Sequence, residues 1–195
     1  MGYRNFGRIG VKQPAEPGPA ALVRSLDPVT CCSLTVVCVD VASTVRAAGG
    51  WLFDRARAGW RVTAWAPAGS DVTPLRILGV ETTFFFEAEL EPSLFTPMPA
   101  SLAVAAELLT SSSPLNARAQ ALSRRGMEVV VWGDEAFTSG QTFEQARHRL
   151  SAAASAFKAR ALRSASSVAT EDSAELFRTC GSWYAIEHGV DLERV

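Results

Sequence analysis

Histidine is scarce in this chain, which contains only two, and its cysteines lack the spacing of metal or redox sites. The four cysteines are Cys31, Cys32, Cys38 and Cys180, and no Cys-x-x-Cys pair occurs among them. Zinc needs three or four ligands, with His and Cys preferred. Adjacent cysteines also make a poor disulfide framework. We therefore predict neither a metal ion nor a cofactor, and we expect the cysteines to be inert.

Nucleotide-binding and hydrolase motifs are missing as well. No Walker-type phosphate loop occurs, and no Gly-x-Gly-x-x-Gly follows the first predicted strand, because residues 40–44 contain no glycine. No Gly-x-Ser-x-Gly elbow provides a serine nucleophile. His148 lies between two arginines and is expected to be solvated on a helix, whereas His188 lies in the C-terminal tail. A Ser or Cys nucleophile therefore lacks an evident base.

The chain also lacks a strong net charge and a membrane-spanning run. Its formal net charge is -1, which gives no general attraction to nucleic acid or to an anionic membrane. The apolar stretch from Leu34 to Ala42 contains Asp40 and is far shorter than the roughly 20 residues needed to cross a bilayer. We expect a cytoplasmic protein with no nucleic-acid and no membrane partner.

Lysine is almost absent, since Lys12 and Lys158 are the only two and the other basic residues are arginines. This bias indicates a GC-rich coding sequence of actinobacterial type. Arginine-rich surfaces also bind phosphate and carboxylate well. The coding bias is the simpler explanation of the excess.

The clearest positive signal is a strand, helix and strand without gaps over residues 31–66. The β-branched stretch from Ser33 to Asp40 is typical of a buried parallel strand. A helix is expected from a cap at Ser43 or Thr44 to Ala58, with Gly59 as its left-handed end. Residues 61–66 form the second predicted strand. This βαβ unit predicts an α/β fold, a three-layer αβα sandwich with a mostly parallel sheet of Rossmann-like type.

Further elements follow in the same style. A turn at Gly69-Ser70-Asp71 leads to a short helix that is capped by Thr73 and ended by Gly79. The later predictions, in chain order, are a strand at 80–86, a surface loop at 88–99, helices at 101–111 and 115–125, and a strand at 127–132.

The C-terminal third is expected to be helical. Thr142 and Gln145 form a capping box, and apolar residues then recur at helical spacing, namely Phe143, Ala146, Leu150, Ala153, Phe157 and Ala161. A last helix is predicted at 171–188, with an apolar side of Leu176, Phe177, Cys180, Trp183 and Tyr184. These elements divide the chain into a flexible tail (1–30), the α/β domain (31–162), and a linker with a helix that packs on the domain or on a partner (163–195).

The βαβ unit resembles the LmbE/PIG-L zinc-dependent N-deacetylases in its spacing. Val39 to Thr44 occupies the place of the family's signature Pro-His-Pro-Asp-Asp-Glu, and Ala48-Gly49-Gly50 that of its small residue and glycine pair. On this match the metal-binding His falls on Asp40, the general-base Asp on Ala42 and the second metal-binding Asp on Ser43. The resemblance implies the fold of a sugar N-deacetylase whose zinc motif is not retained. Independently, the glycine pair is expected to let the first helix lie close to the sheet.

Polar residues after the strands mark the expected ligand crevice. Open α/β sheets bind ligands at the carboxyl ends of their strands. The candidate ligand-binding residues are Asp40, Ser43, Thr44, Ser70, Asp71, Asp134 and Glu135.

Several functions remain open at this point. The first is a non-catalytic protein that binds a small polar ligand, a sugar or a nucleotide, at this crevice. The second is a protein-interaction module or a homodimer that uses the 88–99 loop and the aromatic tail. A nucleotide-sugar-binding domain of the glycosyltransferase type and an enzyme of unrecognised mechanism are further alternatives.

Overall fold

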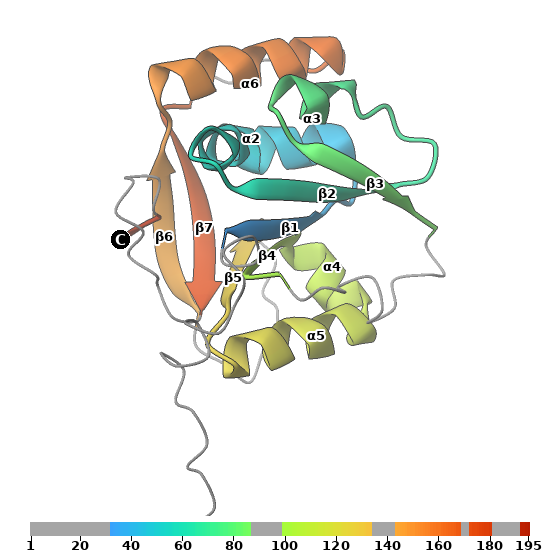
Figure 1. The fold of residues 1–195 in the computed structure, drawn as a ribbon, viewed down its shortest axis with the longest axis vertical. Helices are drawn as coiled ribbons and strands as arrows, with labels where there is room; N and C mark the ends of the chain where they lie inside the picture. Colours follow the sequence, from blue (N-terminus) through green and yellow to red (C-terminus); the bar gives the residue numbers. More distant parts are fainter. Residues whose placement is uncertain (1–31, 87–98, 134–142, 169–171, 181–191) are drawn as a thin grey trace, which may run out of the picture.

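The computed structural model describes residues 32–86, 99–133, 143–168, 172–180 and 192–195. These residues form one eight-stranded sheet with helices on both faces (Figure 1). The strands are β1 (Ser33–Val37), β2 (Arg61–Pro67), β3 (Glu81–Phe85), β4 (Ser101–Ala105), β5 (Glu128–Trp132), β6 (Glu144–Arg149), β7 (Ala174–Cys180) and β8 (Glu193–Arg194). The helices are α2 (Val41–Arg57), α3 (Thr73–Ile77), α4 (Ala106–Ser111), α5 (Ser113–Arg124) and α6 (Ala152–Ser164).

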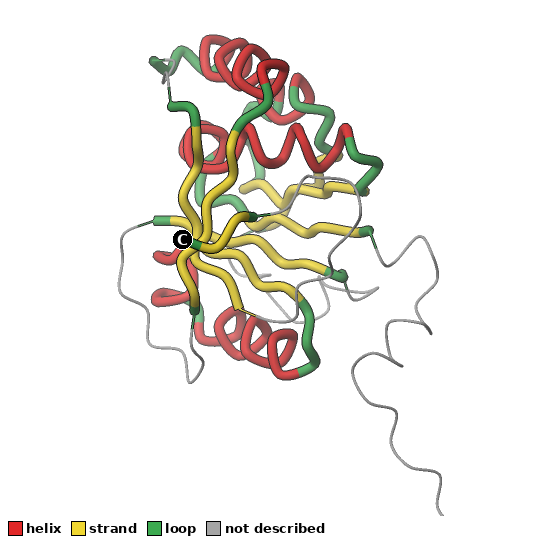
Figure 2. Tube along the Cα trace, turned by 90° about the vertical axis from the view of Figure 1, so that its left-hand side faces the viewer, coloured by secondary structure: helices red, strands yellow, loops and turns green. Residues whose placement is uncertain are grey.

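The sheet is parallel over most of its width. Strands β3, β2, β1, β4 and β5 lie in that order and are parallel, and β7, β6 and β8 follow antiparallel. Helices α2, α3 and α6 cover one face, and α4 and α5 lie on the other, so that the strands form the middle layer (Figures 1 and 2). The predicted αβα sandwich is confirmed. The strand order reverses between β1 and β4, which is where open α/β sheets bind their ligands.

The predicted βαβ unit is confirmed as β1, α2 and β2, with one difference at the helix start. Asp40 is the N-cap, and Ser43 and Thr44 lie within the first turn instead of capping it. At the other end Gly59 has a φ of 87°, the left-handed conformation that glycine adopts without strain. The strands predicted at 80–86 and 127–132 are also present, as β3 and β5.

The helix predicted at 101–111 is wrong in its first half. Ser101–Ala105 forms β4, which pairs with β1 and β5, and α4 follows at once. All five residues of β4 are buried. A short apolar run without polar interruptions fits a buried strand as well as a helix, so periodicity does not separate the two.

The helix predicted from 142 onward is wrong up to residue 149. Glu144–Arg149 forms β6, in which the inward residues Ala146 and His148 are buried. Ser151 then caps α6, and its hydroxyl accepts a hydrogen bond from the Ala154 N–H (3.0 Å). Thr142 lies outside the described residues. The alternation of buried and exposed residues over six positions overrides the capping signal.

The last predicted helix is wrong for residues 174–180. They form β7, which lies between β5 and β6 and pairs antiparallel with both. Phe177 packs on Trp51 of α2 with ring centroids 5.2 Å apart, whereas Leu176 on the other face is 71% exposed. The C-terminal segment therefore contributes an interior strand to the sheet. Trp183 and Tyr184, the 1–30 tail and residues 88–98 of the predicted loop lie outside the described residues.

Apolar side chains fill both spaces between the sheet and its helices. Trp51, Leu52 and Val45 of α2 are fully buried against one face, and Leu109 and Leu115 are buried beneath the other. Cys38 is buried, as strand alternation predicted, and burial raises the pKa of its thiol to about 11. In the described segments no helix is long and apolar enough to cross a membrane.

Candidate functional site

The carboxyl ends of β1, β2, β4 and β5 meet at one edge of the sheet, where the sequence predicts a ligand crevice. Asp40 follows β1, and Ser70 and Asp71 follow β2. Asp134 and Glu135 come directly after Gly133 at the end of β5, outside the described residues. With strands about 4.8 Å apart, the end of β5 lies roughly 10 Å from the end of β1.

The polar groups after β1 bond to one another. The Ser43 N–H donates to Asp40 Oδ1 (2.8 Å), and the Thr44 hydroxyl donates to the Asp40 carbonyl (2.8 Å). The Ser43 hydroxyl donates to the same carbonyl (3.3 Å). Asp40 is exposed, whereas Thr44 is buried. These three residues form the start of α2, and their role in ligand binding stays a prediction.

The residues after β2 form a tight turn. The Ser70 N–H donates to the Pro67 carbonyl (3.1 Å), and Asp71 Oδ1 accepts the Thr73 N–H (2.9 Å). Hydrogen bonds from the Thr73 side chain and backbone hold the pKa of Asp71 below its ordinary value. The predicted cap of α3 at Thr73 is therefore wrong, since Thr73 lies inside the helix and Asp71 bonds to its N–H.

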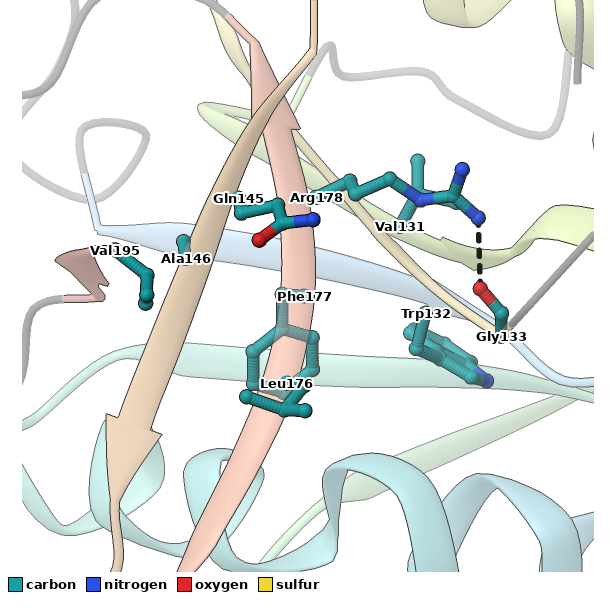
Figure 3. A pocket seen from close by; sticks show the side chains of 9 residues that line it. All are labelled: Val131, Trp132, Gly133, Gln145, Ala146, Leu176, Phe177, Arg178 and Val195. Carbon is teal, nitrogen blue, oxygen red and sulfur yellow. Dashed lines mark hydrogen bonds between the residues drawn. The ribbon is translucent and has the colours of Figure 1, made fainter. Parts of the chain in front are cut away.

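A cavity of about 480 Å³ opens at the carboxyl end of β5 (Figure 3). The pairing of β5 with β7 runs from Val129–Cys180 to Val131–Arg178, and the cavity lies where that pairing ends. Gly133 turns the chain away from β5 with a φ of 101°. The cavity is lined by Val131, Trp132, Gly133, Gln145, Ala146, Leu176, Phe177, Arg178 and Val195.

Polar donors and aromatic rings line this cavity together. Arg178 Nη2 donates to the Gly133 carbonyl (2.7 Å), and Gln145 is its direct cross-strand neighbour. Figure 3 shows the Gln145 amide beside the aliphatic stem of Arg178, with Trp132 and Phe177 nearby. Ligand sites combine apolar walls with a few placed polar groups, as this cavity does. None of the described candidates from the sequence, Asp40, Ser43, Thr44, Ser70 and Asp71, lines it.

Sequence reasoning missed the cavity because it treated β6 and β7 as helices. A helical interpretation places Gln145 in a capping box and Phe177 on the apolar side of another helix. It predicts no contact between the two segments. The alternation of Arg147, His148 and Arg149 within β6 is the period-2 signal that favours a strand.

A buried ion pair joins β7 to α2 and α6. Lys158 Nζ lies 2.6 Å from Glu175 Oε1, and the N–H groups of Gly50 and Trp51 donate to the two oxygens of Glu175 at 2.8 Å each. Burial raises the pKa of Glu175, and Lys158 and the two N–H groups oppose the rise. A Cβ on Gly50 would lie 2.5 Å from Leu150 Cγ. Gly50 thus lets α2 lie close to β7, as predicted for the glycine pair.

His148 belongs to a second buried network, so its predicted solvation is wrong. It is 4% exposed, and its Nε2 lies 2.9 Å from Asp54 Oδ2. The Ser151 hydroxyl donates to Asp54 Oδ1 (2.7 Å) and not to His148. A catalytic triad needs the histidine between the serine and the carboxylate. Here the carboxylate is in the middle, and the network ties α2 to β6 and to the start of α6.

The residues at the family's zinc positions do not fit a zinc ion. Of the two residues at metal-ligand positions, the Asp40 carboxylate caps α2 and Ser43 is engaged in the first turn of that helix, and Ala42 at the general-base position offers no donor atom. Across the described part of the chain, no three His, Cys, Asp or Glu residues are grouped to hold a metal ion. Zinc requires such a set of ligands.

No family model and no curated protein matches the sequence, but solved deacetylase structures share its fold. A deacetylase–teicoplanin complex from teicoplanin biosynthesis aligns with a TM-score of 0.54 at 11% identity, over 77% of this chain and 98% of that chain. The antimicrobial reagent A40926 pseudoaglycone deacetylase Dbv21 gives 0.52 at 12% identity, over 69% and 81%. The zinc-inhibited teicoplanin deacetylase Orf2 gives 0.51 at 12%, over 67% and 82%. The implied deacetylase-like fold is confirmed.

Proposed function

We propose that this protein binds a small polar ligand of the sugar type in the cavity at the end of β5, without zinc-dependent deacetylation. The cavity carries the proposal, because it combines hydrogen-bond donors with exposed apolar side chains at the carboxyl edge of a deacetylase-like fold. Its volume of about 480 Å³ is in the range of small-molecule sites.

The lining residues suit a molecule with hydroxyl groups on one side and an apolar face on the other. Arg178 and Gln145 supply donors, and the Gln145 carbonyl and the backbone of Gly133 supply acceptors. Leu176 and Val195, which line the cavity and are 71% and 72% exposed, supply apolar surface for the nonpolar face of a sugar ring. Asp134 and Glu135, which follow Gly133 in the sequence, are proposed as further acceptors.

The absence of deacetylation is proposed from the residues that stand at the metal-ligand and general-base positions of the deacetylase family. Ala42 replaces the general base on the family match, so nothing there accepts a proton from a water molecule. A binding function needs neither that base nor the metal ligands. It needs the cavity, which is built mainly from β5, β6 and β7.

The test is a calorimetric titration of the purified protein with monosaccharides and with their phosphorylated and oxidised derivatives. We expect saturable binding by at least one member and no release of acetate from its N-acetylated form. No binding by any member contradicts the proposal, and stoichiometric acetate release contradicts its non-catalytic part.

A matched pair of variants locates the site. Leu176 lines the cavity and is 71% exposed, so Leu176→Trp is expected to obstruct the cavity without disturbing the core. Val168 is 84% exposed and does not line the cavity, and Val168→Trp is the control. Loss of binding in the first variant alone supports this site. Equal binding in both variants places the ligand elsewhere.

A second candidate function, protein interaction or homodimerisation, is favoured by the edge strand β3. It lies at one end of the sheet and carries Phe84 and Phe86, which are 47% and 64% exposed on its face and just beyond its end. Exposed aromatic residues on an edge strand are typical of a contact surface. Light scattering of the wild type and of a Phe84→Ser, Phe86→Ser variant tests it: a dimer that becomes a monomer supports this function, and a wild-type monomer contradicts homodimerisation.

A further inference from the structure

The two edges of the described sheet, β3 and β8, differ in how they are protected. Strand β8 has two residues, Glu193 and Arg194, and both form ion pairs, with Arg147 (3.1 Å) and Glu144 (2.9 Å) respectively. Short and charged edge strands are one means by which proteins prevent pairing with another chain. Strand β3 has five residues, contains no Lys or Pro, and carries its one charge on Glu81 at its start. The β3 edge is therefore open to a further strand (Figure 1).

Every second residue of β3 directs its backbone N–H and C=O groups to this free edge. The Phe85 carbonyl accepts the Ala68 N–H (2.9 Å), so the backbone groups of Phe85 face β2. Successive residues of a parallel strand direct their backbone groups to opposite sides. The backbone of Thr83 therefore also faces β2, and the N–H and C=O groups of Thr82 and Phe84 lie at the free edge.

We infer that the β3 edges of two copies of this chain pair antiparallel about a two-fold axis at Thr83, which joins the two sheets into one. This inference rests on the second candidate function, homodimerisation, and adds the geometry of the contact to it. With the two Thr83 residues opposite each other, Thr82 of each copy is opposite Phe84 of the other. The free N–H and C=O groups of Thr82 and Phe84 then exchange hydrogen bonds across the interface. A two-fold axis closes such an assembly as a dimer.

The side chains of β3 suit this register on both faces. Thr82 and Phe84 lie on the face toward α2, because Phe84 pairs with Ala66, which belongs to the core on that side. The register places Thr82 beside the 47% exposed ring of Phe84 twice, and pairs of β-branched and aromatic residues stabilise a sheet. On the other face the two Thr83 side chains meet, and threonine pairs form hydrogen bonds across strands.

Charge favours this register over the neighbouring one. A two-fold axis at Phe84 would also join the free backbone groups, but a pairing continued along the sequence would place Glu81 opposite Glu87 of the second copy. Like charges directly opposite each other destabilise a sheet. With the axis at Thr83, Glu81 is opposite Phe85, and the two Glu81 residues are four positions apart, roughly 13 Å along the strands. This separation exceeds the screening length of about 8 Å at physiological salt.

Disulfide crosslinking tests the register. Opposite residues that exchange no backbone hydrogen bonds have Cα atoms about 4.5 Å apart, which is within reach of a disulfide. Under mild oxidation Thr83→Cys is therefore expected to form a covalent dimer that the wild type does not form. Glu81→Cys, on the same face of β3 but away from the axis, is the matched control and is expected to give no more dimer than the wild type. Peptide mass spectrometry identifies the bond.

A proline variant tests the backbone pairing by itself. Thr82→Pro removes an N–H that faces the free edge, so the pairing of β3 with β2 is kept. By symmetry the dimer loses two hydrogen bonds, and its dissociation constant in sedimentation equilibrium is expected to increase by about 10-fold or more. Thr82→Val keeps the N–H and the β-branched shape, and is expected to change the constant by less than about 3-fold. If Thr82→Pro does not fold, the crosslinking comparison decides.

The outcomes separate this inference from the candidate functions. A wild-type monomer at the highest soluble concentration overturns the inference and the homodimer together. A dimer that persists in Thr82→Pro, or equal crosslinking of the two cysteine variants, overturns the β3 pairing and leaves homodimerisation through another surface. Sugar binding, measured in the same samples, is expected to be unchanged in every variant, because none of the substituted residues lines the cavity.

Discussion

Gly50 lies where α2 contacts Leu150 and Glu175, and its replacement by alanine tests the packing of that region. The added Cβ would lie 2.5 and 2.6 Å from Leu150 Cγ and Cδ2, and 3.2 Å from Glu175 Oε1. Gly49, its neighbour in the same helix, is the matched control. A Cβ there would lie 3.1 Å from Val45 Cγ1 and 3.4 Å from Leu78 Cδ1, which are the ends of side chains.

The two substitutions share one favourable term and differ in the others. Alanine in place of glycine within a helix stabilises by about 1 kcal/mol. At Gly50 the overlap with Leu150 costs about 1–3 kcal/mol. Displacing the Glu175 carboxylate from the Gly50 N–H costs about 1.5–3 kcal/mol more. We therefore expect Gly50→Ala to lower the free energy of unfolding by about 1.5–5 kcal/mol, and Gly49→Ala to change it by less than about 1 kcal/mol.

Urea unfolding of the wild type and both variants, followed by tryptophan fluorescence and circular dichroism, measures this difference. The fluorescence probe includes Trp51, whose ring is buried beside Phe177 and whose backbone N–H donates to Glu175. Equal stability of the two variants would refute the close approach of α2 to β7. A more stable Gly50→Ala protein would show that helix propensity alone governs this position.

Three further predictions concern Glu175, Cys38 and zinc. Burial raises the pKa of Glu175, so the folded state retains a proton that the unfolded state releases. The contribution of Glu175 to the free energy of unfolding is therefore greatest below its ordinary pKa of 4.5. That contribution decreases as the pH rises from 4.5 to the raised pKa of the folded state. The difference in unfolding free energy between wild type and Glu175→Gln should decrease over that interval in urea titrations at a series of pH values, and a constant difference would argue against it. Because the pKa of Cys38 is about 11, iodoacetamide at neutral pH should leave Cys38 unmodified in the native protein and modify it in urea, as read by peptide mass spectrometry. Elemental analysis should find well below one zinc per chain, because Ala42 and Ser43 stand at two of the three matched positions; about one zinc that survives dialysis would contradict this.

The N-terminal half of the fold was predictable from sequence because its signals are local. The apolar run before Asp40, the helix that ends at Gly59 and the strand after it each carry their own pattern within one short segment. The deacetylase-like spacing of the same segment also predicted the fold that the solved structures share. The identity of Ala42 and Ser43 was enough to question zinc binding there.

Strands β4, β6 and β7 were not predictable in this way, because they depend on partners far along the chain. Ser101–Ala105 and Glu144–Arg149 carry apolar or mixed patterns that suit a helix or a strand, and pairing with distant strands decides between them. His148 looked solvated because its two neighbours are arginines, yet its burial follows from strand alternation and from Asp54 on α2.

By itself, the sequence determined the α/β class, the course of the first βαβ unit and the replacement of the family's general base and second metal-binding Asp by Ala42 and Ser43, since each of these depends on residues close together in the chain. Tertiary structure alone decided where β7 lies, that Gly50 meets Glu175, and that Arg178 and Gln145 line one cavity. The physical reason is that β7 fills a place between β5 and β6, and that burial and pairing there outweigh the weak local preferences of its residues.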